Sequence, residues 1–290
     1  MTWSTGWPAP AKINRFLHIV GRRADGYHLL ETVFQFLDFA DELAFRPRRD
    51  GLIRRLDAAA VPDDLAVRAA RCLAETAGGA MGADIYIDKR LPAGGGLGGG
   101  SSDAATTLVA LNHLWDLGAT TEELQALGLR LGADVPVFMG GETAWAEGVG
   151  EQLHPLAADE PWVVLVDPGV TVATSECFAA PELTRQVPRS KMRRLDAARQ
   201  GNVFEPVVRE RYPSVGAALD WLGQYAEARL TGSGGCCFGV VADRAEAQRV
   251  AALVPHQWRG LAVRAVNQSP LLSRLGRSAA VDSASRANGA

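Results

Sequence analysis

The segment LPAGGGLGGGSSDAATTLVALNHLW, residues 91–115, carries six glycines between positions 94 and 100. Glycine loses more backbone entropy on folding than any other residue, so such a run indicates that the backbone must approach another group closely. From Ser101 onward, apolar residues recur at helical spacing until Gly118, which predicts a helix directly after the loop. The first N–H groups of a helix are unpaired and positively polarised, so the segment predicts an anion-binding loop.

Two known phosphate-binding patterns fit this loop poorly. Gly94, Gly96 and Gly99 match GxGxxG, the dinucleotide pattern, but the acidic residue expected at the end of a second strand about 20 positions later is missing. Asp116 is the nearest candidate, and it falls at the end of the helix. The nucleotide P-loop needs a lysine before its hydroxyl residue, which this loop lacks. A linker is disfavoured because strand-like ADIYIDKRLP precedes the loop. We therefore expect a phosphate loop of a third type.

Composition restricts the class of protein. A chain of 290 residues with 47% hydrophobic residues can form two domains with a sizeable core. Apolar runs such as PWVVLV are far shorter than the roughly 18 residues of a membrane span, and the N-terminus lacks a signal-peptide pattern. A net charge of −3 gives no support for nucleic-acid or membrane partners. The four cysteines lack metal-site spacing, which favours a cytoplasmic protein. Composition leaves monomer and homodimer equally open.

The rest of the chain predicts an α+β protein in which a sheet is backed by helices on one face. The proline-containing, acidic stretch 154–161 suits a domain junction, so we expect domains at 1–158 and 159–276. The small polar residues 277–290 are expected to be disordered. A turn is expected at Asp25 and Gly26. Strands are expected at 11–21, 29–39, 41–47, 83–92, 143–156, 161–166, 226–242 and 260–267, and helices at 63–78, 101–117, 120–131, 214–225 and 243–254.

Three separated motifs give the sequence a family resemblance. PAKIN at 10–14, LPAGGGLGGGSSDAA at 91–105 and LTGSGGCCFG at 230–239 resemble the motifs of the galactokinase, homoserine kinase, mevalonate kinase and phosphomevalonate kinase superfamily. The stretches 21–38, 131–138 and 146–151 are similar to the branch that phosphorylates 4-diphosphocytidyl-2-C-methyl-D-erythritol in the non-mevalonate isoprenoid route. The resemblance runs from about Pro8 to about Pro270. It implies a ribosomal-protein-S5-like N-terminal domain, a ferredoxin-like C-terminal domain and an active site in the cleft between them.

The resemblance also implies an ATP- and magnesium-dependent phosphoryl transfer to the 2-hydroxyl of that acceptor. Such a transfer needs positioned phosphates, charge neutralisation and a group that accepts the hydroxyl proton. Asp134, in GADVPVF, matches the catalytic aspartate and is expected to be the general base. Lys12, in PAKIN, is expected to be its partner, because an ammonium lying among apolar residues needs a counter-charge. The resemblance implies ATP contacts at Lys89, Pro92, Gly94, Gly95, Gly96, Leu97, Gly98, Gly99, Gly100, Ser101 and Ser102, the two serines offering hydroxyls to the phosphates or to magnesium.

The acceptor contacts implied by the resemblance come from both halves of the chain. Tyr27, His28 and Phe178 are expected to hold the cytidine by aromatic faces and by the imidazole edge. Thr174 is expected near the diphosphate or the ribose. Asn14 is expected on the same side of its strand as Lys12, where it can hydrogen-bond the substrate. Gly232, Ser233 and Gly234 would close over the phosphates or the acceptor.

One position departs from the family pattern. Asp64 stands where relatives often carry an asparagine near the adenine, and an aspartate cannot donate a hydrogen bond there. The histidines form no cluster of metal-ligand spacing, so no zinc site is expected.

Three alternatives remain at this point. Another kinase of the same superfamily, acting on homoserine or a mevalonate-like alcohol, would not need cytidine. A dinucleotide-dependent oxidoreductase rests only on the GxGxxG match. A non-catalytic nucleotide-binding module is disfavoured by the presence of both Lys12 and Asp134.

Overall fold

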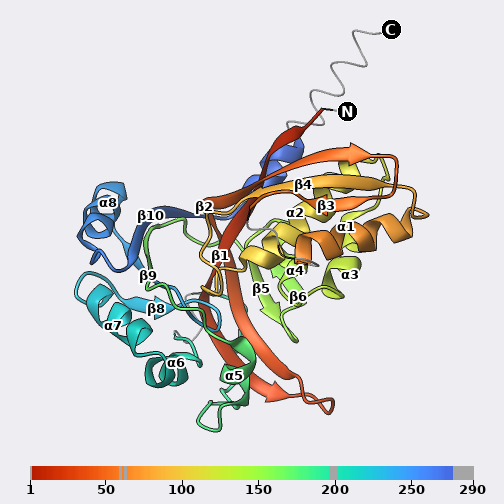
Figure 1. Cartoon of the computed structure of the whole chain (residues 1–290). Coiled ribbons are helices and arrows are strands. Elements are labelled where there is room, and N and C mark those ends of the chain that lie inside the picture. The colour runs from red at the N-terminus through yellow and green to blue at the C-terminus, as the bar shows by residue number, and fades with distance from the viewer. Residues whose placement is uncertain (1, 59–60, 62–63, 196–200, 277–290) are drawn as a thin grey trace.

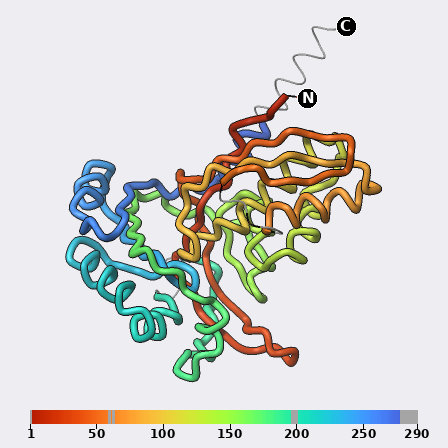
Figure 2. The backbone as a smooth tube through the Cα atoms, viewed as in Figure 1, coloured from red at the N-terminus to blue at the C-terminus, as the bar shows by residue number. Residues whose placement is uncertain are grey.

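Two long antiparallel strands, β1 (Ser4–Arg22) and β2 (His28–Arg48), run through the whole molecule. The computed structural model describes residues 2–58, 61, 64–195 and 201–276. The two strands join at the turn predicted from Asp25 and Gly26, where Gly26 has a φ of +92°. Figure 2 shows this turn projecting away from the rest of the backbone. Most of β1 is buried, because β2 pairs along its length and helix α2 (Gly99–Leu114) covers it.

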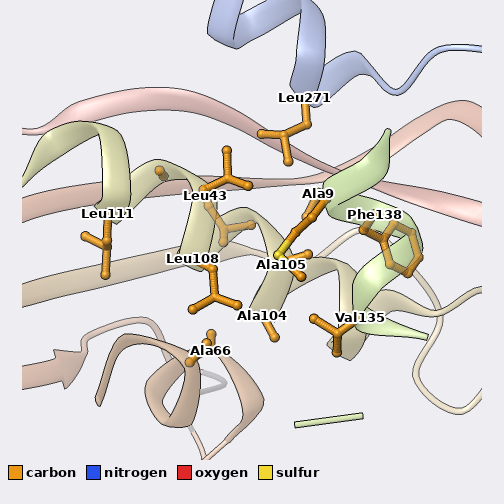
Figure 3. Close-up of a cluster of buried hydrophobic side chains, with 14 of the residues drawn as sticks. Ala9, Leu43, Ala66, Ala104, Ala105, Leu108, Leu111, Val135, Phe138 and Leu271 are labelled. Carbon is orange, nitrogen blue, oxygen red and sulfur yellow. The ribbon is translucent and has the colours of Figure 1, made fainter. Parts of the chain in front are cut away.

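The first half of the chain forms a helical layer against the sheet. Helices α1 to α3 lie at one side of the β1–β2 ribbon in Figure 1. Their apolar faces form a core with β1, β2 and β4, and Figure 3 shows part of it, with Leu108 of α2 and Phe138 of α4. The elements are β3 (Ile53–Arg55), α1 (Leu65–Thr76), β4 (Gly82–Asp88), α2 (Gly99–Leu114), α3 (Thr121–Leu129) and α4 (Val135–Gly140), followed by the hairpin β5 (Ala144–Glu147) and β6 (Gln152–Pro155).

The second half of the chain forms its own core at the opposite side of the ribbon. Helices α6 to α8 pack there against the strands that follow the predicted junction (Figure 1). The elements are β7 (Trp162–Asp167), α5 (Thr174–Ala179), α6 (Glu205–Arg211), α7 (Pro213–Leu222), β8 (Ala228–Leu230), β9 (Cys237–Val241), α8 (Arg244–Leu253) and β10 (Arg259–Val266). Within the described ranges, no helix combines the length and apolarity that a bilayer span requires.

Strand β10 connects the two halves. It pairs antiparallel with β7 on one side and with the middle of β2 on the other, where Ala265 lies opposite Leu37. The described strands therefore form one connected sheet, with the main order β3-β4-β2-β10-β7-β9-β8. After β10 the chain returns to the first half, and Leu271 joins the core of α2 and α4 (Figure 3). The expected tail, 277–290, lies outside the described residues.

Three element predictions were wrong in detail. Segment 143–156 forms a hairpin of two strands, β5 and β6, because Gly148 and Gly150, with φ of +74° and +114°, place a turn between them. Segments 29–39 and 41–47 form one strand, β2, so Asp41 lies inside a strand rather than at its beginning. Segment 226–242 forms β8 and β9, separated by a turn over residues 231–236 in which Gly232, Gly234 and Gly235 have φ of +58°, +118° and +95°. Such positive φ values do not occur in regular strand. This glycine-rich turn is the part of segment 226–242 that lines the cleft between the two halves.

A small third core lies between the two halves. It contains Ala11 and Ile13 of β1, Leu97 of the glycine loop, and Cys236 and Phe238 of the second half. The glycine loop is therefore anchored by an apolar side chain in a core that both halves contribute to. This contact explains how the loop keeps a fixed position although most of its residues lack side chains.

A buried carboxylate with three arginines stabilises the outer part of the sheet. Asp84 of β4 is fully buried and forms ion pairs with Arg54 at 2.8 Å, Arg46 at 2.5 Å and Arg48 at 3.1 Å. Burial alone would raise the pKa of Asp84, but hydrogen bonds from these arginines outweigh it and hold the pKa below the ordinary 3.8. Because folding lowers this pKa, the stabilisation is complete above the unfolded aspartate pKa and is lost as the pH falls toward the folded one.

We expect Asp84→Asn to lower the free energy of unfolding at pH 7 by about 2 kcal/mol, since charge-assisted hydrogen bonds to a buried acceptor are lost while the arginines are partly solvated. Urea unfolding at pH 7 and pH 3 measures this, and the difference from wild type should narrow at pH 3. Asp50→Asn is the matched control, because Asp50 is exposed and pairs with Arg48 at the surface. Equal effects of the two substitutions at pH 7 would contradict the account.

Candidate active site

A cleft of about 930 Å³ opens where the two halves of the chain meet. The glycine loop and the N-terminal ends of α1 and α2 line one part of it. The middle is lined by Lys12 and Asn14 of β1 and by Asp134, and the far part by α5 and the 231–236 turn. The size is that of a small-molecule site.

The glycine loop is held so tightly that side chains are excluded from it. Gly96 has a φ of +77°, and a Cβ there would lie 2.0 Å from the carbonyl oxygen of Thr231. Gly98 has a φ of +73°, and a Cβ there would lie 2.7 Å from Phe138 and 3.2 Å from the Cε of Lys12. The Lys12 N–H donates to the Leu97 carbonyl at 3.0 Å, which joins the loop to β1. The glycines are therefore required by close approach.

The loop passes directly into α2, whose first turn faces the cleft. Helix α2 begins at Gly99, two residues earlier than predicted, with Gly98 in the left-handed conformation as its N-cap. Ser101 lines the cleft. Ser102 Oγ and Asp103 Oδ1 are buried and have no hydrogen-bond partner among the described residues. The unpaired N–H groups of this first turn favour an anion at the cleft.

Lys12 and Asp134 meet in the middle of the cleft. Lys12 Nζ lies 3.4 Å from Asp134 Oδ2. The lysine side chain is 3% exposed and the aspartate side chain 36%, so the carboxylate is the member of the pair that solvent or a substrate can reach. Asp134 is the residue before α4. Lys12 was expected at the start of a strand, but β1 begins earlier, at Ser4, so Lys12 lies near its middle. The ammonium also lies over the Phe34 ring at 5.1 Å, which adds a favourable contact.

Asn14 fixes Lys12 and joins it to the second half. Its Oδ1 accepts from Lys12 Nζ at 2.7 Å and from the Gly232 N–H at 3.0 Å. Its Nδ2 donates to Thr32 Oγ1 at 2.8 Å. Its backbone N–H donates to Thr231 Oγ1 at 3.1 Å. Asn14 lies on the same side of β1 as Lys12, as expected, and its polar atoms already have protein partners.

Lys89 closes the base of the loop. Its Nζ donates to Asp41 Oδ2 and to Asp103 Oδ2, at 2.5 Å and 2.8 Å. Asp41 Oδ1 also accepts the N–H groups of Arg90 and Leu91. Burial lowers the pKa of Lys89, but the two carboxylates outweigh it and raise the pKa. The pKa of Asp103 is raised, mainly by burial. The Lys89 ammonium lowers this pKa, but burial and the Asp41 carboxylate together outweigh it.

At the α1 end of the cleft, Asp64 is engaged by its own half. Asp64 Oδ1 accepts the Val67 N–H at 2.8 Å and caps α1, and Asp64 Oδ2 accepts Arg55 Nη1 at 2.5 Å. Arg55 also holds Asp57 through its Nε and Nη2. The carboxylate can accept further hydrogen bonds from a ligand but cannot donate one.

At the other end, aromatic rings form a wall. The His28 and Phe178 rings stack at 5.0 Å with an interplanar angle of 22°, and Phe178 meets Phe204 edge-on at 4.8 Å. Burial lowers the pKa of His28, and the nearby charges of Arg185 and Arg22 lower it further, which favours a neutral imidazole. Thr174 Oγ1 and Ser233 Oγ are 2.6 Å apart, joining α5 to the 231–236 turn.

Comparison with known proteins identifies the family. The GHMP kinases N terminal domain matches residues 64–142, and the GHMP kinases C terminal domain matches residues 183–260. The chain belongs to the GHMP kinase family. The dinucleotide alternative is wrong, because the strand before the glycine loop, β4, pairs antiparallel with β2 instead of lying in a doubly wound parallel sheet.

The relatives at 54% and 55% identity carry one name. The chain is 55% identical to the 4-diphosphocytidyl-2-C-methyl-D-erythritol kinase of Alkalilimnicola ehrlichii, over 95% of this chain and 96% of that protein. It is 54% identical to the protein of the same name from Halorhodospira halophila, over 93% and 95%. A crystal structure of 4-(cytidine 5'-diphospho)-2C-methyl-D-erythritol kinase, 33% identical, superposes with a TM-score of 0.79 over 91% of this chain and 99% of that one. These relatives confirm the two-domain α+β architecture of a GHMP kinase.

Most of the site residues predicted for this GHMP kinase lie around one cleft. It is lined by Lys12, Asn14, Lys89, Pro92, Gly94, Gly95, Gly96, Leu97, Gly98, Gly99, Gly100, Ser101, Asp134, Thr174, Phe178, Gly232 and Ser233. His28 reaches it through its stack on Phe178. Tyr27 is 64% exposed and lies beside Arg23 instead of the His28–Phe178 stack. Ser102 is buried behind the first turn of α2, and Gly234 lies behind Ser233 against Val208.

Several residues that hold the candidate site together were not predicted from the sequence. Asp41 and Asp103 hold the base of the loop, and Thr231 and Thr32 hold Asn14. Asp103 had a local signal, since a carboxylate among the apolar residues of a buried helix needs a partner. Asp41, Thr32 and Thr231 had none, because each bonds to chain segments far away in sequence.

Proposed function

We propose that this GHMP kinase transfers the γ-phosphoryl group of ATP to the 2-hydroxyl of 4-diphosphocytidyl-2-C-methyl-D-erythritol, a step of isoprenoid precursor synthesis. The observation that carries the proposal is the Lys12–Asp134 pair at 3.4 Å, in a cleft with the glycine loop on one side and the aromatic wall on the other. The names of the relatives at 54% and 55% identity support the choice of acceptor. Phosphoryl transfer depends on positioning and charge neutralisation, and this arrangement supplies both.

The proposed reaction moves one proton and one phosphoryl group. The acceptor hydroxyl loses its proton to the Asp134 carboxylate while its oxygen forms a bond to the γ-phosphorus. The bond between that phosphorus and the β–γ bridging oxygen breaks, and ADP leaves. Because a carboxylate is a much weaker base than an alkoxide, the proton moves only as the O–P bond forms. Lys12 lies 3.4 Å from Asp134 and stabilises the charge that develops on the reacting oxygen.

The glycine loop and the first turn of α2 are proposed to hold the β- and γ-phosphates through backbone N–H groups. The residues there also fit Mg²⁺, because Ser101 and Asp103 line the cleft and Asp103 Oδ1 lacks a partner among the described residues. Mg²⁺ binds through few protein oxygens and retains waters or phosphates as its other ligands. No group of three or more His, Cys, Asp or Glu side chains suited to a metal occurs in the described ranges. Mg²⁺ bound with ATP would neutralise phosphate charge.

The acceptor is proposed to lie along the far part of the cleft. Phe178 offers a ring face to the cytosine, and a neutral His28 can donate from one ring nitrogen and accept at the other. Thr174 and Ser233 lie where a diphosphate or ribose would pass. Tyr27 is proposed as a second aromatic contact that requires a change in its side-chain orientation.

ADP release tests this proposal with 4-diphosphocytidyl-2-C-methyl-D-erythritol, homoserine and mevalonate offered separately. We expect turnover with the cytidine compound alone, and competitive inhibition of that turnover by CDP. Turnover with homoserine or mevalonate would retain the kinase and contradict the cytidine pocket. No turnover with any of the three, in a folded protein that binds ATP, would favour a non-catalytic nucleotide-binding role.

A further inference from the structure

Arg185 binds the end of helix α5 entirely through backbone carbonyls. Its Nη2 donates to the Phe178 carbonyl at 3.1 Å and to the Ala180 carbonyl at 2.5 Å. Its Nη1 donates to the Leu183 carbonyl at 3.1 Å and to the Pro181 carbonyl at 3.4 Å. No motif in the sequence singles out this arginine.

The end of α5 needs such a partner. Helix α5 has six residues, Thr174–Ala179, and its C-cap Ala180 is extended, so the chain leaves the helix abruptly. The last carbonyls of a helix have no intrahelical donors, and arginine side chains can satisfy them. The planar guanidinium has five N–H donors in a fixed fork, so one side chain can orient several carbonyls together, which a lysine ammonium does less well.

The residue that this contact orients most directly is Phe178. Its carbonyl is one of the four acceptors, and its ring is stacked on His28 and packed edge-on against Phe204. The other end of α5 is joined to the cleft separately, through Thr174 and Ser233. Arg185 therefore acts on the aromatic end of α5, independently of the hydroxyl end.

We propose that Arg185 is a positioning residue for the base of the acceptor: it fixes the α5 terminus so that the Phe178 ring stands at the cleft as a stacking surface for a pyrimidine nucleotide. This inference rests on the proposed function, which places the acceptor base at Phe178. A second effect follows from charge. The Arg185 guanidinium lowers the pKa of His28, as burial and Arg22 also do, and so helps to keep the imidazole edge neutral.

Arg185→Met tests the proposal, because methionine keeps an unbranched apolar chain and removes all donors. We expect the dissociation constant of CDP, measured by calorimetry, and the KM of the acceptor each to rise about tenfold as the stacking surface becomes mobile. The kcat and the KM of ATP should stay within about twofold of wild type. An NMR titration should show a higher pKa for His28, because a neighbouring positive charge is gone.

Arg211→Met is the matched control. Arg211 contacts the same helix at the Glu176 carbonyl and pairs with Glu182, but it does not contact Phe178. We expect its CDP affinity and acceptor KM to equal those of wild type. If Arg185→Met does not fold, Arg185→Lys retains the charge and part of the bonding, and an intermediate loss of CDP affinity is expected.

The outcomes separate the inference from the proposed function. Wild-type affinity for CDP in a folded Arg185 variant would overturn the positioning role. An equal loss of CDP affinity in Arg211→Met would also overturn it, since a general loosening of α5 would then suffice. A wild-type protein that binds no CDP and does not phosphorylate the cytidine acceptor would overturn the proposed function instead.

Discussion

Replacing Asp134 with asparagine is expected to lower kcat by about 10² to 10⁴, because the amide cannot accept the hydroxyl proton. The KM values of ATP and acceptor should change little, since asparagine keeps the shape of the side chain. The variant should fold because Asp134 is 36% exposed and does not cap α4, but some stability is lost because the buried Lys12 ammonium loses its counter-charge. Steady-state ADP release with saturating substrates measures the effect.

The matched control is Asp88→Asn. Asp88 ends β4, is 55% exposed and pairs with Arg90 at the surface, so its replacement should leave kcat unchanged. A kcat for Asp134→Asn within about threefold of wild type would contradict a general-base role, since that role is worth at least about 10². Lys12 would then be the residue on which catalysis depends.

Gly96→Ala is expected to reduce kcat/KM for ATP by about 10² or more. Its Cβ would lie 2.0 Å from the Thr231 carbonyl oxygen and 3.0 Å from the Gly234 oxygen. Both neighbours are backbone atoms, so the loop must move as a whole. Displacing a positioned group by about 1 Å lowers the reaction rate by about 10². Nucleotide titration of the folded variant, together with its steady-state rate, measures the effect.

Gly118→Ala separates close approach from backbone strain. Gly118 has a φ of +69°, like that of Gly96, but a Cβ there meets no described atom within 4 Å. The control therefore carries the conformational cost of about 1–2 kcal/mol in stability without a clash. We expect its affinity for ATP to equal that of wild type. If Gly96→Ala binds ATP as Gly118→Ala does, the loop does not hold the phosphates as proposed.

The main elements of the fold could be predicted from local patterns. Asp25 and Gly26 supply turn chemistry between two apolar segments, and the β1–β2 hairpin follows from that. The periodic apolar residues after the glycine loop predicted α2. The segment 226–242 was misjudged because apolar residues flank its glycines on both sides, which resembles one strand. Glycines with positive φ break the strand in a turn that packs closely on the glycine loop, Gly232 against Gly96 and Gly235 against Gly94 and Gly95. This approach between distant segments leaves no local pattern.

In the candidate site, motifs predicted several residues, but the contacts between residues far apart in sequence could not be predicted. Lys12 and Asp134 were predicted because motifs around each resemble those of a kinase family; their distance of 3.4 Å cannot be deduced from positions so far apart in sequence. Asp41 was missed because it accepts backbone N–H groups of a segment far away in sequence. Arg185 was missed because its acceptors are backbone carbonyls, which any residue type supplies, so no residue pattern marks them. Asn14 was predicted on the correct side of β1, but its network with Gly232 was not.

The most direct test of the central claim is to identify the product. Wild-type protein, ATP, Mg²⁺ and 4-diphosphocytidyl-2-C-methyl-D-erythritol would be incubated and followed by ³¹P NMR, with Asp134→Asn in parallel. We predict a new phosphomonoester signal coupled to the 2-position of the methylerythritol, one for each ADP formed, and at least about a hundredfold slower appearance in the variant. ADP that forms without the phosphomonoester, or at equal rates in both proteins, would contradict phosphoryl transfer at the Lys12–Asp134 pair.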